Sequence, residues 1–373
     1  MKKQLILFLI IISLLIPSSV FAVEQSDIEK HMQTDIELVN KVYQFILDSY
    51  PLGADSKKLA EAGLKGMLQS LDPYSDYYTA EEATALFQDL EGSYSGIGLY
   101  IEQAEDHIRV IEPIKGSNAE KAGIIKGDII ISIDGIDTKG MNASDASSKI
   151  KGPSGTSVML GIRRSGTTDS LFYIIERQEI VINPVSYEII NNSIGYIKLT
   201  SFPQSAYIQL RAALIEFDKK SIEKVILDIR DNGGGLLNQA VSISGLFVPE
   251  GPVVYIKEKN KELYTFISSN KAPKYQLVLL VNENSASASE IFTGAIKDRN
   301  AGIIVGKKTF GKGIVQSIIP LMNGGIIKMT TSEYLTPNQT RIHGIGIQPH
   351  IEITNSATED LQLKKAVEIL SGK

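Results

Sequence analysis

The C-terminal half of the chain alternates short runs of consecutive apolar residues with segments of helical periodicity. Residues 225–229 and 277–281 are two such runs, and residues 236–247 between them have the spacing of a helix. Strands that are apolar at every position are typical of a sheet with both faces covered. The pattern therefore predicts an α/β core, which we place at residues 181–355.

Two further apolar runs extend this pattern toward the C-terminus. Residues 303–305 and 326–331 are expected to continue the same sheet. An amphipathic segment within residues 356–373 predicts a closing helix.

Residues 91–180 have a different character, with short strands and frequent turns. Val158, Leu160 and Ile162 recur with a period of two, which is typical of a half-buried strand. Turn residues are dense, as in the Gly-Pro-Ser-Gly of residues 152–155. The region therefore predicts a small, partly open β-barrel domain.

Residues 23–90 are predicted to be helical. Ile36 and Val39 recur at helical spacing, and Thr79 with Glu82 forms the sequence of a capping box. The segment carries no evident catalytic pattern, so we expect a packing and dimerisation element without chemistry. Together with the barrel and the core, it makes the chain a multidomain α+β protein.

Residues 1–22 have the composition of a secretory signal peptide. Lys2 and Lys3 precede the apolar run 5–16, and small residues lead up to Ala22. The run is shorter than the roughly 20 residues that a membrane-spanning helix needs, so cleavage after Ala22 is favoured over an uncleaved anchor. We expect an exported protein of the periplasm or cell envelope, associated with the membrane only if the signal is not cleaved.

The composition excludes several classes of function. A net charge of −5 provides no basic surface for nucleic acid. The absence of cysteine excludes a thiol nucleophile, disulfides and thiolate metal sites. The four histidines form no H-E-x-x-H pair, so neither a metal nor another cofactor is expected.

Two turns at the ends of predicted core strands carry unusual sequences. Three glycines at residues 233–235 follow one strand, and consecutive glycines allow main-chain N–H groups to converge on a ligand. Ser287 follows another strand and precedes a helix, where the helix dipole favours negative charge. Such a place suits a tetrahedral oxyanion, although a tight turn and close helix packing explain the same residues without chemistry.

A lysine with a glycine on each side, Lys312, enters a later strand. Surface lysines seldom need such neighbours, and burial lowers the pKa of a lysine so that it can act as a general base. Gln316, four residues on, is expected to point toward the amine. A histidine base fits less well, because two histidines lie outside the α/β region and two lie in a Gly- and Pro-rich terminal segment. A serine–lysine pair is the arrangement that the residue inventory leaves open.

Three motifs together resemble the signature of the carboxyl-terminal processing proteases, also called tail-specific proteases. They occur in the family's order at residues 227–235, 285–290 and 310–316. Residues 71–73 and 344–349 are similar to the same family, so the resemblance covers essentially the whole mature chain. It implies a core of the ClpP/crotonase type and a serine endopeptidase that acts near the C-termini of proteins.

The resemblance also implies catalytic roles. The family's nucleophile is the central serine of S-A-S-A-S-E, which falls on Ser287. Its general base is the lysine of F-G-K-G, which falls on Lys312, and its supporting glutamine falls on Gln316.

The oxyanion hole follows from the same resemblance. Its donors would be the N–H of Ala288 and that of a glycine in the D-N-G-G-G turn, Gly235 or Gly234. Ser285 and Ser289 would remain packing and capping residues.

The predicted barrel is similar to the PDZ domain of these proteases. Gly96, Ile97, Gly98 and Leu99 resemble its carboxylate-binding loop, whose main-chain amides capture the C-terminus of a peptide that adds as a strand. We therefore expect protein and peptide substrates bound by their C-termini. A homodimer and an adaptor protein stay open as further partners, and nucleic acid is not expected.

Two other interpretations stay open. A PDZ adaptor on an inactivated protease scaffold would bind C-terminal peptides without cutting them. An acyl-CoA enzyme of the crotonase type would share the core and its glycine-lined oxyanion pocket, but it explains neither the PDZ-like region nor export.

Overall fold

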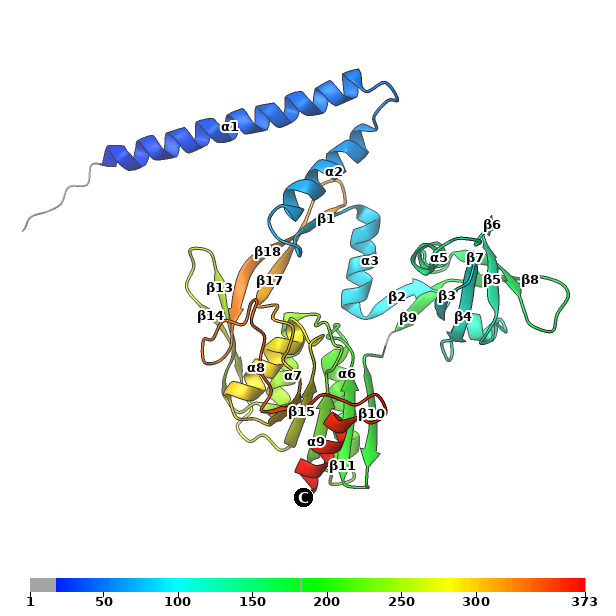
Figure 1. Cartoon of the computed structure of the whole chain (residues 1–373), viewed down its shortest axis with the longest axis vertical. Helices are drawn as coiled ribbons and strands as arrows, with labels where there is room; N and C mark the ends of the chain where they lie inside the picture. The colour runs from blue at the N-terminus through cyan, green and yellow to red at the C-terminus, as the bar shows by residue number, and fades with distance from the viewer. Residues whose placement is uncertain (1–17, 182, 373) are drawn as a thin grey trace, which may run out of the picture. The chain divides into compact units, whose positions relative to one another are not determined.

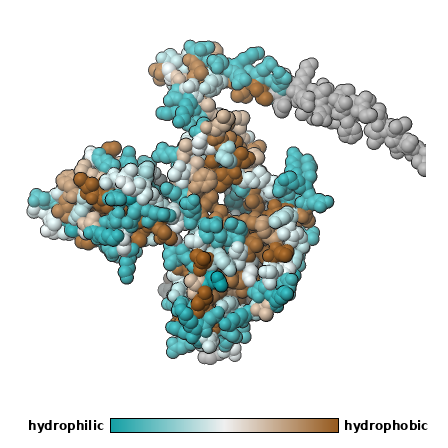
Figure 2. All heavy atoms as spheres, turned by 180° about the vertical axis from the view of Figure 1, so that it is seen from behind, coloured by the Kyte–Doolittle hydropathy of each residue, from teal (hydrophilic) through white to brown (hydrophobic). Residues whose placement is uncertain are grey.

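A computed structural model describes residues 18–181 and 183–372 (Figure 1). The contacts divide the chain into two compact units, with the boundary between Ser70 and Leu71. Most of the predicted signal peptide, residues 1–22, lies outside the described residues. No helix in the described part of the chain is both long and apolar enough to span a lipid bilayer. Figure 2 shows hydrophobic residues spread among hydrophilic ones over the face that it draws, which is common in folded proteins.

The described residues of the first unit form two helices, α1 (Ser18–Ser49) and α2 (Ser56–Gln69). Helix α2 begins after Asp55 because the carboxylate of this residue accepts hydrogen bonds from two main-chain N–H groups of the first turn. The side chains of Ile36 and Val39 on α1 are more than half exposed, at 56% and 59%. Their helical spacing therefore does not reflect packing within the described part of this unit.

The predicted barrel is a six-stranded antiparallel sheet with two short helices. Val158, Leu160 and Ile162 are buried in its hydrophobic core, as their period of two predicts. The elements are β3 (Leu99–Ala104), β4 (His107–Pro113), α4 (Asn118–Lys121), β5 (Ile129–Ile133), β6 (Ile136–Asp137), α5 (Ala143–Ile150), β7 (Ser157–Arg163) and β8 (Leu171–Glu176).

Two short strands, β2 (Ser93–Gly96) and β9 (Gln178–Val181), flank this sheet in the sequence and pair with each other. Helix α3 (Ala80–Glu91) precedes β2. It begins with the predicted capping box, in which Thr79 and Glu82 each bind the other's main-chain N–H.

A six-stranded sheet forms the centre of the core. In spatial order its strands are β10 (Val185–Ile190), β11 (Ile194–Leu199), β12 (Lys224–Asp228), β15 (Gln276–Val281), β16 (Ile303–Gly306) and β19 (Ile351–Glu352). Neighbouring strands run parallel except for β10 and β11.

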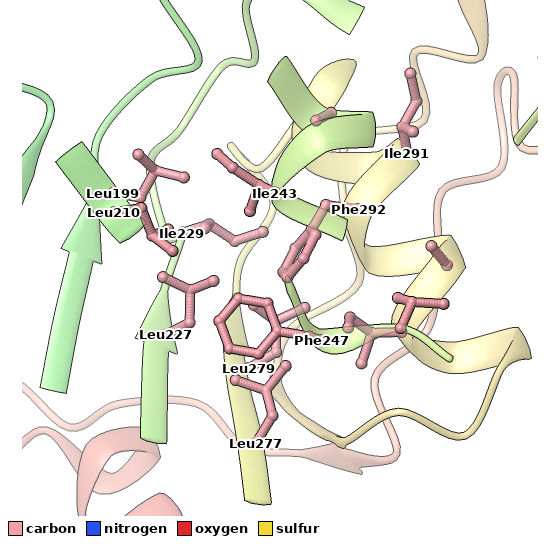
Figure 3. Packing of buried hydrophobic residues seen from close by; sticks show 14 of the residues in the cluster. Leu199, Leu210, Leu227, Ile229, Ile243, Phe247, Leu277, Leu279, Ile291 and Phe292 are labelled. Atoms are coloured by element: carbon pink, nitrogen blue, oxygen red, sulfur yellow. The ribbon is translucent and has the colours of Figure 1, made fainter. Parts of the chain in front are cut away.

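Helices cover both faces of this sheet. One face carries α6 (Ala206–Asp218), α7 (Leu237–Phe247) and α8 (Ala288–Asp298). Figure 3 shows how Phe247 and Phe292, from α7 and α8, pack near Leu279 of β15. The other face carries α9 (Leu361–Ser371), which buries Ala366 and Leu370 against alternate strand residues. The predicted α/β arrangement is confirmed.

A second, five-stranded sheet completes the core. Its strands are β1 (Asp76–Tyr78), β18 (Ile326–Leu335), β13 (Gly251–Glu258) and β14 (Tyr264–Ser268) in spatial order, with β17 (Ile314–Pro320) also paired to β18. The expectation that residues 326–331 continue the first sheet is therefore wrong, and residues 76–78 form a strand within the segment predicted to be helical. An apolar run indicates that a strand is buried, but it does not identify the strand beside it.

A substitution at Gly195 of β11 can test how closely the first sheet is packed. A Cβ at this position would lie 2.2 Å from the ring of Phe217 in α6. We expect Gly195→Ala to lower the free energy of unfolding by about 1–3 kcal/mol, because the ring has to shift in a close-packed core.

The matched control is Gly245→Ala in α7. No atom lies within 4 Å of a Cβ at Gly245, and alanine favours a helix, so this variant should keep or slightly raise the stability. Urea denaturation followed by circular dichroism compares the two variants. Equal stability of both would contradict the packing argument.

Candidate active site

Ser287 lies on the turn between β15 and α8, as the sequence predicts. Its φ of 56° is in the left-handed region, which is unusual for a residue other than glycine. The flanking serines are engaged elsewhere. Ser285 Oγ donates to the carbonyl of Ile229 over 2.8 Å. Ser289 Oγ donates to the carbonyl of Asn232 over the same distance. The strained turn thus places Ser287 at the positive end of a helix dipole.

The glycine turn after β12 packs directly against this serine. A Cβ at Gly234 would lie 2.8 Å from the Cβ of Ser287, and the φ of Gly234 is 105°, so glycine is required here. The N–H of Gly234 already donates to Oδ1 of Asn232 over 2.9 Å. Within the described residues, the N–H groups of Gly235 and Ala288 make no hydrogen bond. These two are therefore the available donors beside the serine.

A buried carboxylate joins the serine turn to the lysine loop. Glu290, in the first turn of α8, is fully buried and accepts a hydrogen bond from the N–H of Ser287 over 3.1 Å. It also accepts from the hydroxyl of Thr309 over 2.6 Å and from the N–H groups of Gly311 and Lys312 over 2.7 Å each. Four donors converge on two oxygens, so one side chain holds the two segments in a single arrangement.

Tyr334 on β18 makes a second connection between the same segments. Its hydroxyl lies 3.0 Å from the carbonyl oxygen of Ser287 and 2.5 Å from that of Lys312. The hydroxyl carries one hydrogen, so it donates to one of the two carbonyls at a time. Burial, and then the charge of Glu290, raise the pKa of Tyr334 well above its ordinary value, so the hydroxyl stays protonated.

The two glycines beside Lys312 are required by close packing. A Cβ at Gly311 would lie 2.9 Å from the main-chain nitrogen of Gly346. A Cβ at Gly313 would lie 2.6 Å from the main-chain nitrogen of His343. The glycines on each side of the lysine thus belong to a loop that packs closely against the segment before β19.

The surroundings of Lys312 lower the pKa of its amine below the ordinary lysine value. The largest cause is burial, and the positive charge of Lys328 on β18 acts in the same direction. The negative charges of Asp72 and Glu290 partly oppose this shift. The neutral amine is the form that can take a proton from a hydroxyl.

Ser287, Lys312 and Gln316 line one cavity of about 650 Å³. Within the described residues, no hydrogen bond joins the Ser287 hydroxyl to the Lys312 amine, and Nζ lies 4.4 Å from the centre of the Tyr74 ring. Gln316 Nε2 donates to Oγ1 of Thr330 over 3.2 Å. Apolar side chains form much of the wall, among them Leu237, Ile256, Phe266, Ile291 and Ile318.

The two C-terminal histidines have main-chain partners. Nδ1 of His350 accepts a hydrogen bond from the N–H of Ile304 over 3.0 Å, and Nδ1 of His343 accepts one from Gly313 over 3.4 Å. Neither histidine lines the cavity. Over residues 18–181 and 183–372, no three metal-ligating side chains converge.

The predicted carboxylate-binding loop lies where β2 leads into β3. Gly98 has a φ of 82°, and a Cβ there would lie 2.3 Å from the Cβ of Ser117, so glycine is required. Ile97, Gly98 and Leu99 line a hollow of about 40 Å³ together with side chains of α5. Gly96 ends β2 and is not part of this hollow.

Comparison with known families gives a match for each part of the chain. Residues 193–353 match the model of peptidase family S41, residues 109–164 that of the PDZ domain, and residues 17–82 that of the activating protease CtpB N-terminal domain. A probable CtpA-like serine protease of Staphylococcus saprophyticus is 36% identical over 343 residues, which are 91% of this chain and 69% of that protein. The chain belongs to peptidase family S41. A relative of the same description from Staphylococcus epidermidis is 36% identical to this S41 peptidase over 345 residues, which cover 91% of it and 70% of the relative.

Solved structures agree with this assignment. The photosystem II D1 C-terminal processing protease is 28% identical and superposes with a TM-score of 0.51, covering 84% of this chain and 86% of its own. A putative S41 protease of Bacteroides fragilis, at 17% identity, shares the fold with a TM-score of 0.52 over 80% of this chain and 86% of its own. The predicted α+β chain with a PDZ domain and a protease core is confirmed.

The sequence analysis did not identify three residues that shape the site of this S41 peptidase. The signal for Glu290 was its spacing from Ser287, since S-x-x-E is the pattern of a capping box. Nothing in the sequence indicated that Tyr334 would join two loops. Tyr74 belongs to the segment for which we expected no chemistry, and the centre of its ring lies 4.4 Å from Nζ of Lys312.

Replacing Glu290 by glutamine tests the junction between the two segments. The amide nitrogen of the variant would face N–H donors, so at least one of the four hydrogen bonds is lost, at a cost of about 1–3 kcal/mol for a buried group. We expect the rate of peptide cleavage to fall by about 10- to 100-fold, measured by mass spectrometry of the products.

Glu283→Gln is the matched control for this change. Glu283 precedes the same serine turn, but its side chain is 58% exposed and pairs with Lys307. Cleavage by this variant should stay close to that of the wild type. An unchanged rate in Glu290→Gln would contradict the role given to the buried carboxylate.

Proposed function

We propose that this S41 peptidase is an exported serine endopeptidase that cleaves proteins near their C-termini, with Ser287 as nucleophile and Lys312 as general base. One observation carries the proposal. Ser287, Lys312 and Gln316 line a single cavity, and the main-chain donors of Ala288 and Gly235 open beside the serine. The family and the names of the relatives support the same chemistry.

The proposed reaction is an acyl transfer in two stages. The neutral amine of Lys312 takes the proton of the Ser287 hydroxyl while the oxygen attacks a peptide carbonyl carbon. The tetrahedral intermediate then collapses, the C–N bond breaks, and Lys312 gives its proton to the leaving amine. A water molecule attacks the ester with the help of the same base, and the new carboxyl group and the free serine are released.

The oxyanion of the tetrahedral intermediate would be held by the N–H groups of Ala288 and Gly235. Both lie at the positive end of the α8 dipole or directly beside it, and one such donor is worth about 10²–10³ in rate. Gln316, four residues after Lys312 on the wall of the same cavity, is given the role of orienting the amine.

The PDZ domain would bind the substrate by its C-terminus. Strand β3 lies at the edge of its sheet, and the hollow beside Gly98 and Leu99 is shared with α5. A peptide can therefore add as a further strand along β3, with its terminal carboxylate at the loop of residues 96–99. A solved relative is named as a C-terminal processing protease, which supports action near the C-terminus of the substrate.

Replacing Ser287 by alanine is the direct test of the nucleophile. Loss of the hydroxyl should lower the rate of cleavage by about 10⁴- to 10⁶-fold, while folding and the binding of C-terminal peptides are retained. Cleavage is measured by mass spectrometry of products from extracted envelope proteins, and binding by fluorescence anisotropy of labelled peptides.

Ser242→Ala, on the exposed side of α7, is the control and should cleave like the wild type. Undiminished cleavage by Ser287→Ala would end the proposal. Wild-type protein that binds C-terminal peptides but cuts none would instead favour the non-catalytic PDZ adaptor.

The pH dependence of cleavage tests the base. Lys312 is neutral above its lowered pKa and protonated below it, so kcat/KM should fall as the pH decreases through that pKa. Lys328→Met removes a positive neighbour, which raises the pKa of Lys312, so the midpoint of the profile should move to higher pH. Steady-state rates across the range in which lysines titrate check both statements. A wild-type profile that stays flat over this range would rule out lysine as the base.

A further inference from the structure

The loop that precedes β1 is closed by Asp72. Its Oδ1 accepts hydrogen bonds from the N–H groups of Tyr74 and Ser75, over 2.8 and 2.9 Å. Its Oδ2 accepts one from the Ser75 hydroxyl over 3.0 Å. Such bonds from a carboxylate to the residues that follow it fix the conformation of a turn. Strand β1 then pairs with β18, with Asp76 opposite Lys328, so the loop is held against the second sheet.

The same loop is linked to Gln316. The N–H of Thr330 donates to the Ser75 hydroxyl over 3.1 Å. Gln316 Nε2 donates in turn to the hydroxyl of Thr330 over 3.2 Å. A segment far away in the sequence therefore positions a residue of the catalytic cavity.

Tyr74 brings this loop to the catalytic amine itself. Nζ of Lys312 lies 4.4 Å from the centre of the Tyr74 ring, within the range of a cation–π interaction. The negative face of the ring attracts a protonated amine strongly and a neutral amine only weakly. In the described residues this amine makes no hydrogen bond to Ser287, and the Tyr74 ring is the partner that the structure shows for it.

The charges around Lys312 act with or against this contact. The charged and titratable groups that face it are Asp72, Tyr74, Glu290, Lys328 and Tyr334. Lys328 is itself held in place, because its Nζ donates to the hydroxyl of Tyr78 over 2.7 Å. A fixed positive charge therefore disfavours the ammonium form of Lys312, and the Tyr74 ring favours it.

We propose that Tyr74 is a positioning residue, whose ring holds the Lys312 ammonium in the free enzyme until the amine turns to Ser287. The inference rests on the proposed role of Lys312 as the base. The cation–π interaction acts before the reaction. It weakens when Lys312 loses its proton, because the attraction depends on the positive charge of the amine. The lysine is thus kept at the wall of the cavity that Ser287 also lines.

Removal of the ring should change how readily the free enzyme loses the lysine proton. Tyr74→Leu keeps an apolar cover over the amine but removes the cation–π partner, so the midpoint of the kcat/KM profile should move to lower pH by about half a unit. Tyr74→Phe keeps the ring and should keep the wild-type midpoint. The midpoint of the kcat profile reports the substrate complex, where the amine has left the ring, and it should not move in either variant.

A second measurement does not require catalysis. In Ser287→Ala protein with ¹³C-labelled lysine side chains, the ring current of Tyr74 should shift the signal of the Lys312 Cε protons upfield. The shift should persist in the Ser287→Ala protein that also carries Tyr74→Phe and vanish with Tyr74→Leu. The signal is assigned by its loss in Lys312→Arg.

The results separate this inference from the proposed function. A kcat/KM midpoint that does not move in Tyr74→Leu, even with a uniformly lower rate, would overturn the positioning role and indicate a merely structural one. A Lys312 signal without an upfield shift at a pH where the amine is charged would also overturn it. If the wild type cleaves nothing, the proposed function fails, and the NMR measurement still decides whether the amine rests on the ring.

Discussion

The carboxylate of Glu290 is the interaction on which the rest of the site depends. A buried charge is costly unless it is fully hydrogen bonded, and here four donors from two separate segments satisfy it. The turn that presents Ser287 and the loop that presents Lys312 are therefore fixed to one common anion. Tyr334 joins their carbonyl groups at the same junction, so neither segment can shift without breaking buried hydrogen bonds.

Much of the fold and of the site could be predicted because the relevant signals are local. Continuous apolar runs predicted the central sheet, and the glycines at residues 233–235 and on each side of Lys312 marked the two segments that line the site. Gly234 lies against Ser287, and Gly313 lies against His343, at distances that no other residue allows. Glycines of this kind indicate a steric limit at the backbone, and the structure identifies the segment that imposes it.

What the sequence could not show is which distant segments meet. Residues 326–331 were correctly expected to form a strand, but besides β17, which directly precedes them, they pair with β1 from a distant part of the chain. The contact between Tyr74 and Lys312 depends on that pairing, because β1 holds the loop of Tyr74 against β18. A single aromatic residue in a turn carries no local signal of a role at a site assembled by tertiary structure.

The pairing of β2 with β9 has a consequence for how such a chain can change. Ser93 lies opposite Val181 and Gly96 opposite Gln178, so the polypeptide enters and leaves the PDZ domain through neighbouring strands. An insertion with adjacent ends can be exchanged, enlarged or lost without rerouting the scaffold that receives it. The PDZ domain and the peptidase core are thus free to diversify separately, each under its own selection.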